Sequence, residues 1–187
     1  MKSLLILHVL FISLFSYTQN CLTRDSLFQK YDEKLVHSEV VLIDSISQIE
    51  LVKRVKNWGG KTFVNLKEVL VGETDNQLVF NFTTSSSGGS KYGNINSITY
   101  VRLIVVFKDG RIKASLYDDG NVAGAGTPAR TYFYTNAFIK PETTICDKGN
   151  EKTYYEIYKN YKLNVLSIME SLKSALKNTS LEVDDDF

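Results

Sequence analysis

Two segments with apolar side chains at every second position, joined by one short turn, constrain this chain most. In "SITYVRLIVVF" (97–107), Val101, Leu103, Val105 and Phe107 fall on one side of an extended backbone. The segment "RIKASLY" that follows alternates in the same way, and the Asp-Gly pair between the two is a strong signal for a tight hairpin. Because successive side chains of a strand point to opposite faces, this pattern predicts a sheet that is packed on one side only.

Further strands are predicted before this hairpin, and loops are predicted around it. The run Val40–Ile43 in "HSEVVLIDS" predicts a buried strand, and "KEVLVGE" (67–73) and "QLVFNFTT" (77–84) predict a pair joined by a turn. The glycine- and serine-rich stretch "SSSGGSKYGN" (85–94) is expected to be a polar loop, and so is "DDGNVAGAGTPA" (118–129).

A first amphipathic helix is predicted over 47–58, where Ser47 and Glu50 have the spacing of a capping box. Gly59–Gly60 are expected to end it in a left-handed conformation. Its apolar face is expected to comprise Ile46, Ile49 and Val52. Trp58, the only tryptophan of the chain, is predicted to hold the end of this helix onto the margin of the sheet rather than to bind a ligand.

A second, longer helix is predicted over 153–177, and "RTYFYTNAFI" (130–139) before it predicts a short strand or a docked aromatic segment. The apolar stripe of the long helix is expected to comprise Tyr154, Tyr158, Tyr161, Val165, Ile168, Leu172 and Ala175. The element order is therefore β-α-β-β-β-β-α. It predicts a two-layer α+β domain, with an antiparallel sheet and both helices on one of its faces.

Length and composition favour one globular domain with extensions. The chain has 187 residues, of which 43% are hydrophobic and 23% charged. Residues 37–178 are expected to form the domain, 19–36 an N-terminal extension and 179–187 an acidic tail. Formal net charge is +1, which provides no overall field for binding nucleic acid.

The first 18 residues have the layout of a secretory signal peptide. A lysine is followed by an apolar run from Leu4 to Phe15, which is shorter than the roughly 20 residues of a membrane-spanning helix. Cleavage before Gln19 is expected, with export to the periplasm or beyond and no membrane span afterwards. A buried N-terminal helix or an uncleaved anchor is the alternative.

Two cysteines follow the expected cleavage point, Cys21 and Cys146. An oxidising compartment permits a disulfide between them. Free thiols or an intermolecular bridge remain open alternatives.

The segments around 47–63, 68–82 and 97–118 together resemble a family of exported Bacteroidetes proteins, a domain of unknown function with a TBP-like fold. In that family a helix that ends in tryptophan precedes a strand pair, and a later strand runs into "KDG" followed by arginine or lysine. Here these positions are Trp58 and Lys108–Arg111. The resemblance implies a TBP-like fold and an exported protein, and it brings no catalytic residues with it.

Candidate catalytic and ligand motifs lack the arrangement their chemistry needs. His37 and Ser38 are adjacent in a strand, so they point to opposite faces and cannot form a nucleophilic pair. The segment Asp118–Asn121 has carboxylates and a glycine but not the distal glutamate of a calcium loop. The glycine-rich stretch 120–129 has no lysine and no helix directly behind it, as a phosphate loop would. No cofactor, metal or catalytic site is therefore expected.

The sheet face away from the helices is the candidate site for a partner. Alternation places on it Asn81, Thr83, Tyr100, Arg102, Lys113, Ser115 and Tyr117. Tyrosine and arginine are typical contact residues. The leading hypothesis is a non-catalytic binding or assembly module of the bacterial envelope, with a protein or glycan partner and no nucleic acid. The alternatives are an envelope hydrolase using Asp118 and Asp119, and a purely structural envelope protein.

Overall fold

The computed structural model describes residues 21–22, 29–31, 34–90, 93–123, 145–146 and 151–177. The predicted signal peptide, the segment 130–139 and the acidic tail lie outside these residues. The elements are β1 (Cys21–Leu22), β2 (Gln29–Tyr31), β3 (Lys34–Leu42), α2 (Gln48–Thr62), α3 (Leu66–Val69), β4 (Leu70–Thr74), β5 (Gln77–Ser90), β6 (Gly93–Lys108), β7 (Arg111–Ala123), β8 (Ile145–Cys146) and α5 (Glu151–Lys177).

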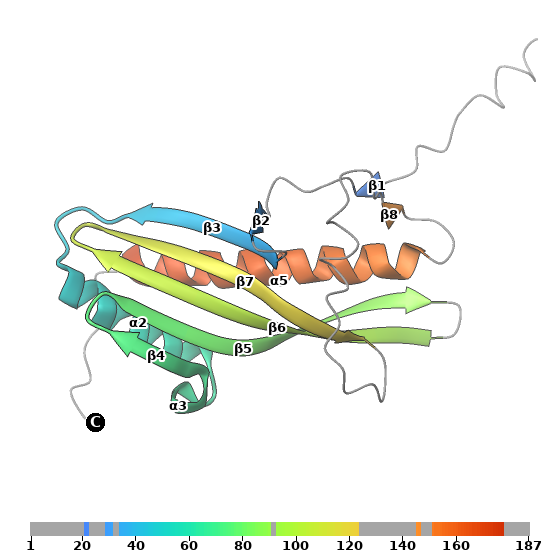
Figure 1. Ribbon diagram of the computed structural model, residues 1–187, viewed down its shortest axis with the longest axis horizontal. Coiled ribbons are helices and arrows are strands. Elements are labelled where there is room, and N and C mark those ends of the chain that lie inside the picture. The colour runs from blue at the N-terminus through green and yellow to red at the C-terminus, as the bar shows by residue number, and fades with distance from the viewer. Residues whose placement is uncertain are drawn as a thin grey trace, which may run out of the picture.

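One antiparallel sheet has the strand order β2-β3-β7-β6-β5-β4, and α2 and α5 both lie across one of its faces (Figure 1). The predicted α+β architecture and the element order are confirmed. The sheet begins earlier than expected, because β3 starts at Lys34 and β2 pairs with its first residues. A separate small pair, β1 and β8, places Cys21 opposite Cys146, as a bridge between them would require.

The core lies between the sheet and the two helices. The alternating residues of β6, from Val101 to Phe107, are buried as predicted, and Phe80 of β5 and Leu116 of β7 lie beside them. From α5, Tyr158, Tyr161, Val165 and Leu172 of the predicted stripe are buried, while Ile168 and Ala175 are half-buried. In the described part of the chain, no helix is both long and apolar enough to cross a membrane.

The buried face of α2 differs from the expected one. Ile49 is 82% exposed, whereas Leu51, Val55 and Trp58 are buried against the sheet. The spacing of four and three residues between them is that of a helix face. The helix does begin as predicted, since the Ser47 side chain accepts a hydrogen bond from the Glu50 backbone amide at 3.4 Å.

The two glycines of α2 do not end the helix, which continues to Thr62. Gly59 instead allows a close approach, because a Cβ there would lie 2.9 Å from Leu66 Cδ1 and 3.1 Å from Phe80 Cε1. The absent side chain lets α2 lie directly on the ring of Phe80.

Trp58 packs as predicted, although it lies one turn before the end of the helix. It is 3% exposed, and its ring meets those of Phe63 and Phe80 edge to face, with centroids 5.6 and 6.0 Å away. Its indole Nε1 donates a hydrogen bond to Ser171 Oγ of α5 at 3.0 Å. Trp58 therefore joins the sheet to both long helices.

The prediction of a glycine–serine loop at 85–94 is wrong for the described residues of this stretch, because 85–90 and 93–94 extend β5 and β6 into a long hairpin (Figure 1). The free edge of β5 in this region is covered by polar side chains of α5. Thr153 donates to the Gly89 carbonyl, Asn160 to the Ser87 carbonyl and Asn164 to the Ser85 carbonyl, at 2.6–2.8 Å. For Asn160 and Asn164 the match is geometric: four helix residues rise about 6 Å, close to the roughly 6.7 Å of two strand residues.

Two further segments differ from their predictions. The loop expected from Asp118 is strand as far as Ala123, with a bulge opposite Tyr100 where Gly120 adopts a φ of 102°. The predicted strand 67–73 begins as the short helix α3, and strand pairing starts at Leu70. The Asp-Gly hairpin is confirmed, since Lys108 pairs with Arg111 around it.

The strand predicted from the run Val40–Ile43 exists, but it is buried on one side only. Val41 and Ile43 face the core and are 6% and 8% exposed. Val40 and Leu42 face the other way and are 61% and 68% exposed. A continuous apolar run is typical of a strand buried on both faces, and here it belongs to a strand near the edge of the sheet.

Candidate functional site

The sheet face opposite the helices, which we call the open face, carries the predicted contact residues on adjacent strands. Register places Asn81 of β5, Arg102 of β6 and Tyr117 of β7 side by side in one row. Thr83 lies beside Tyr100 in the next row toward the long hairpin. The sequence pattern therefore brings these side chains together on one face, as alternation requires.

Arg102 is held in place by its neighbours on this face. Its Nη2 lies 2.8 Å from Asp119 Oδ2 in an ion pair, and its Nε donates to Asn81 Oδ1 at 3.3 Å. The Arg102 side chain is still 42% exposed. It presents a fixed, partly neutralised cation between two half-buried tyrosines, Tyr100 and Tyr117.

Two other predicted contact residues differ from each other in exposure. Lys113 is exposed on the open face. Ser115 is 7% exposed, and its hydroxyl accepts a hydrogen bond from Ser38 Oγ at 2.9 Å across the β3–β7 pair. Ser115 is therefore a packing position. On this face of β7, Lys113 and Tyr117 on either side of Ser115 are the more accessible residues.

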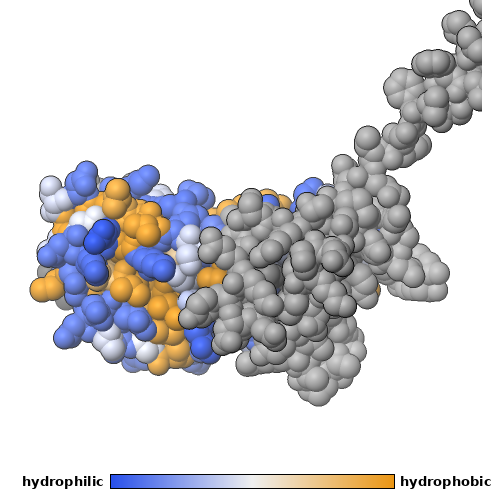
Figure 2. All heavy atoms as spheres, turned by 45° about the horizontal axis from the view of Figure 1, so that its top comes forward, coloured by the Kyte–Doolittle hydropathy of each residue, from blue (hydrophilic) through white to orange (hydrophobic). Residues whose placement is uncertain are grey.

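At one end the open face is apolar. The residues of this apolar end are Val40, Leu42, Val79, Ile104 and Val106. Figure 2 shows apolar and polar residues side by side on the end of the molecule where β3, β6 and β7 meet. Register places Val106 next to Lys113 and Lys113 next to Val40, so the apolar side chains flank a cation.

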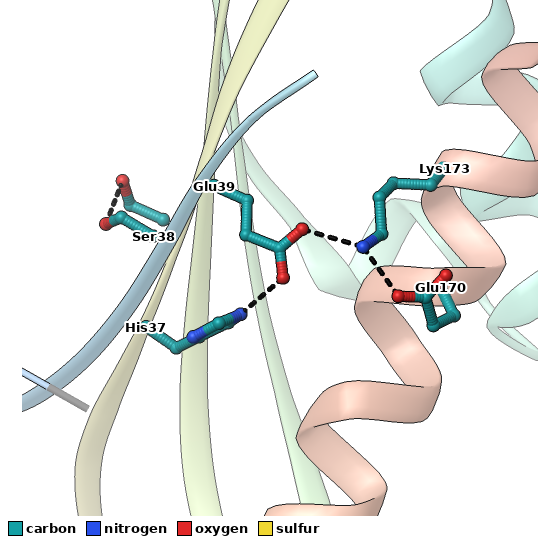
Figure 3. Close-up of polar contacts among 6 residues, drawn as sticks. His37, Ser38, Glu39, Glu170 and Lys173 are labelled. Atoms are coloured by element: carbon teal, nitrogen blue, oxygen red, sulfur yellow. Dashed lines mark hydrogen bonds and ion pairs between the residues drawn. The ribbon is translucent and has the colours of Figure 1, made fainter. Parts of the chain in front are cut away.

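A charged cluster lies on the other side of β3, between that strand and α5 (Figure 3). Glu39 accepts hydrogen bonds from His37 Nε2 and from Lys173 Nζ, each at 2.7 Å, and Lys173 also pairs with Glu170. Burial alone would raise the pKa of Glu39, but the hydrogen bonds from Lys173 and His37 hold that pKa below its usual range. The hydrogen bonds that Lys173 donates to Glu170 and Glu39 raise the pKa of Lys173.

We expect this cluster to stabilise the fold between the two shifted pKa values. A carboxylate with a lowered pKa contributes stability above its unfolded-state pKa and loses it as pH falls below 4.5. A lysine with a raised pKa loses its contribution only as pH rises above 10.5. Lys173→Met should lower the free energy of unfolding by roughly 1 kcal/mol at pH 7 and by much less at pH 3. Urea denaturation at both pH values measures this, with Lys159→Met on the exposed side of α5 as control. An equal loss at both pH values would contradict the assignment.

The residues considered for catalysis lie on different faces. Figure 3 shows Ser38 on the opposite side of β3 from His37, as predicted. Asp118 is 1% exposed on the helix side of β7, where its Oδ1 accepts from the Gly120 amide at 2.9 Å. Asp119 lies on the open face, paired with Arg102. The two aspartates therefore do not form an acid–base pair with each other.

The helix side of the long hairpin is polar, which the sequence analysis did not recognise. Ser86, Ser97, Thr99 and Asp118 are all buried there, opposite the first half of α5. The alternation pattern contained this signal, because these residues continue the inward positions of β5, β6 and β7. Across the described residues, no group of three or more His, Cys, Asp or Glu side chains could hold a metal ion.

Comparison with known proteins identifies the fold. No family model and no curated protein matches the sequence. A DUF4468 family protein from Bacteroides ovatus is similar in structure, with a TM-score of 0.62 and 13% sequence identity; the match covers 82% of this chain and 92% of the other. A TBP-like protein from Parabacteroides distasonis matches with a TM-score of 0.52 and 14% identity, over 81% of this chain and 98% of the other.

The fold is TBP-like. The resemblance inferred from Trp58 and the Lys108–Arg111 turn is confirmed at the level of fold, and both solved structures come from Bacteroidetes. At 13–14% identity these similarities carry no residue roles. A TBP-like fold hosts function through its sites and not through its name, so activity has to be argued from the open face.

Proposed function

We propose that this TBP-like domain is a non-catalytic binding module, exported to the bacterial envelope, that binds a protein partner through the open face of its sheet. The observation that carries the proposal is the one-sided packing of the sheet. Both long helices lie on one face, and the other face combines a fixed arginine, two half-buried tyrosines and an apolar end. Aromatic and arginine anchors beside apolar side chains are the usual composition of a protein contact.

Export rests on the sequence pattern of residues 1–18 and on the cysteine pair. The register that sets Cys21 opposite Cys146 is compatible with a disulfide, which an exported protein can form. A glycan partner would use the same tyrosines, because aromatic rings also stack on sugars.

Paired substitutions on the open face test this proposal. The partner would be captured from native envelope with the purified full-length chain, and its affinity would then be measured with purified components. Tyr100→Ala with Arg102→Ala should weaken binding roughly tenfold or more, and Ile104→Ser with Val106→Ser should do the same. Circular dichroism would show whether each variant keeps the wild-type fold.

The matched control removes similar apolar surface from the helix layer. Ile49 and Leu163 are 82% and 55% exposed on α2 and α5. Ile49→Ser with Leu163→Ser should leave affinity unchanged. Unchanged affinity in both open-face variants, or a loss in the control, would show that the open face is not the binding surface.

A further inference from the structure

One edge of the sheet, the outer side of β3 from Ser38 to Leu42, carries backbone groups that have no partner among the described residues. The Ile43 amide donates to the Gly110 carbonyl of the β6–β7 turn at 2.8 Å. In an antiparallel ladder only alternate residues bond to a given neighbour, so Glu39 and Val41 also bond to β7. Ser38, Val40 and Leu42 then direct their amides and carbonyls away from the sheet. On that side β2 pairs with β3 only as far as Val36. No described residue pairs with the outward groups of Ser38, Val40 and Leu42.

Two other edges of the same sheet, along β5 and β4, are protected. Along β5, side chains of α5 bond to the outward backbone groups of Ser85, Ser87 and Gly89. At the far edge of the sheet from β3, the edge strand β4 is short and has a bulge between Leu70 and Gly72. It also carries an ion pair between Glu73 and Lys56. Short strands, bulges and charges are the usual means of blocking edge pairing.

This edge of β3 is neither short nor bulged, and its one charged side chain, Glu39, points to the helix side. Between Ser38 and Leu42 there is no proline, no lysine and no bulge, and the carboxylate of Glu39 is bonded to Lys173 on the helix side. Val40 and Leu42 are more than half exposed beside the free backbone groups. A strand of this kind is a template for a further strand.

The side chains around this edge specify the chemistry of the added strand. Lys108, Arg111 and Lys113 are exposed on β6 and β7, and none has an ion-pair partner among the described residues. Register sets Lys113 beside Val40 and Arg111 beside Leu42. A new strand beside β3 would lie two strand spacings, about 10 Å, from β7. Acidic side chains on that strand would be within reach of the long side chains of Arg111 and Lys113. On its helix side it would meet the margin of the core at Val41 and Ile43.

We propose that the Ser38–Leu42 edge of β3 binds an extended segment of a partner protein in which apolar and acidic residues alternate. The backbone of that segment pairs with Ser38, Val40 and Leu42. Its acidic side chains face Arg111 and Lys113 on the open side, and its apolar side chains extend the core on the helix side. This goes beyond the proposed function, because it uses the edge of the sheet and does not require contacts to Tyr100 or Arg102.

A labelled heptapeptide of alternating valine and glutamate is the probe, and fluorescence anisotropy with the full-length chain measures its binding. Val40→Pro should weaken binding roughly fivefold to tenfold, since proline removes an outward amide without removing a bond to β7. Arg111→Glu with Lys113→Glu should weaken it roughly tenfold while leaving the backbone edge intact. Lys67→Glu, an exposed lysine on α3, is the control and should have no effect.

Two altered peptides separate strand addition from simple charge attraction. The same peptide with N-methyl groups on alternate residues keeps its charge but cannot donate to β3, and it should not bind. A valine–lysine peptide should not bind either. Binding of the N-methylated peptide, or equal binding by the Arg111/Lys113 variant, would overturn the proposal.

Other occupants of the edge give different results. A dimer seen by light scattering that Val40→Pro dissociates would show that a second copy fills the edge, and it would overturn the proposal. Peptide binding only after removal of residues 178–187 would assign the edge to the chain's own acidic tail, with the same consequence. Tyr100→Ala with Arg102→Ala should bind the peptide like wild type, so failure of the open-face proposal can be told apart from failure of this one.

Discussion

Trp58→Ala should lower the free energy of unfolding by about 3–5 kcal/mol. The indole is almost fully buried, contacts the rings of Phe63 and Phe80, and donates to Ser171. Its removal leaves a cavity where α2, α5 and β5 meet, and it leaves the Ser171 hydroxyl without this donor. Urea or guanidinium denaturation, followed by circular dichroism because the only tryptophan is lost, measures the change.

Two comparisons make the Trp58 result specific. Trp58→Phe should lose less than the alanine variant, because it keeps most of the ring packing and loses the hydrogen bond. Ile49→Ala on the exposed side of the same helix should change stability by less than about 0.5 kcal/mol. A loss below about 1 kcal/mol for Trp58→Ala would mean that the indole does not join the layers.

Adjacent glycines in the long hairpin should respond differently to the same substitution. A Cβ on Gly88 would lie 2.3 Å from the Thr153 carbonyl oxygen and 2.9 Å from Ile157 Cγ1, so α5 would have to move away from β5. A Cβ on Gly89 would meet only the Glu156 carboxylate at 3.4 Å and Asn94 Oδ1 at 4.0 Å. Gly88→Ala should therefore cost about 2–3 kcal/mol, whereas Gly89→Ala should change stability by less than about 0.5 kcal/mol.

Thermal and denaturant unfolding of both glycine variants test this difference. Hydrogen exchange adds a local measurement, because displacement of α5 should increase exchange at the amides of Ile157 and Tyr158 in the Gly88 variant. Equal stability of the two variants would show that the hairpin does not pack tightly on α5.

Much of the sheet could be predicted because alternation is a local property. Val101, Leu103, Val105 and Phe107 follow one another at a period of two, and nothing in the fold changes which side they share. The open-face positions followed from the same rule. Ser115 shows its limit: alternation gave the correct face, and the neighbours of Ser115 decided that it is buried.

Residues that interact with distant segments were predicted less well. The stretch 85–94 has the composition of a loop, but its residues 85–90 form a strand because α5, about 70 residues later, supplies hydrogen bonds to the edge of that strand. Gly59 was expected to end a helix, but it permits contact with Phe80. Local composition contains no information about these partners.

The sequence by itself determined the two-layer architecture, the order of its main elements and the side of the alternating strands β5, β6 and β7 that faces the core, since these depend on the period of apolar residues along a short segment. Only the tertiary structure decided which edges of the sheet are covered. The polar face of α5 lies along β5, whereas the outer side of β3 from Ser38 to Leu42 has no neighbour among the described residues. Edge protection depends on how far apart two elements are in space, and the pattern along a single strand does not record that distance.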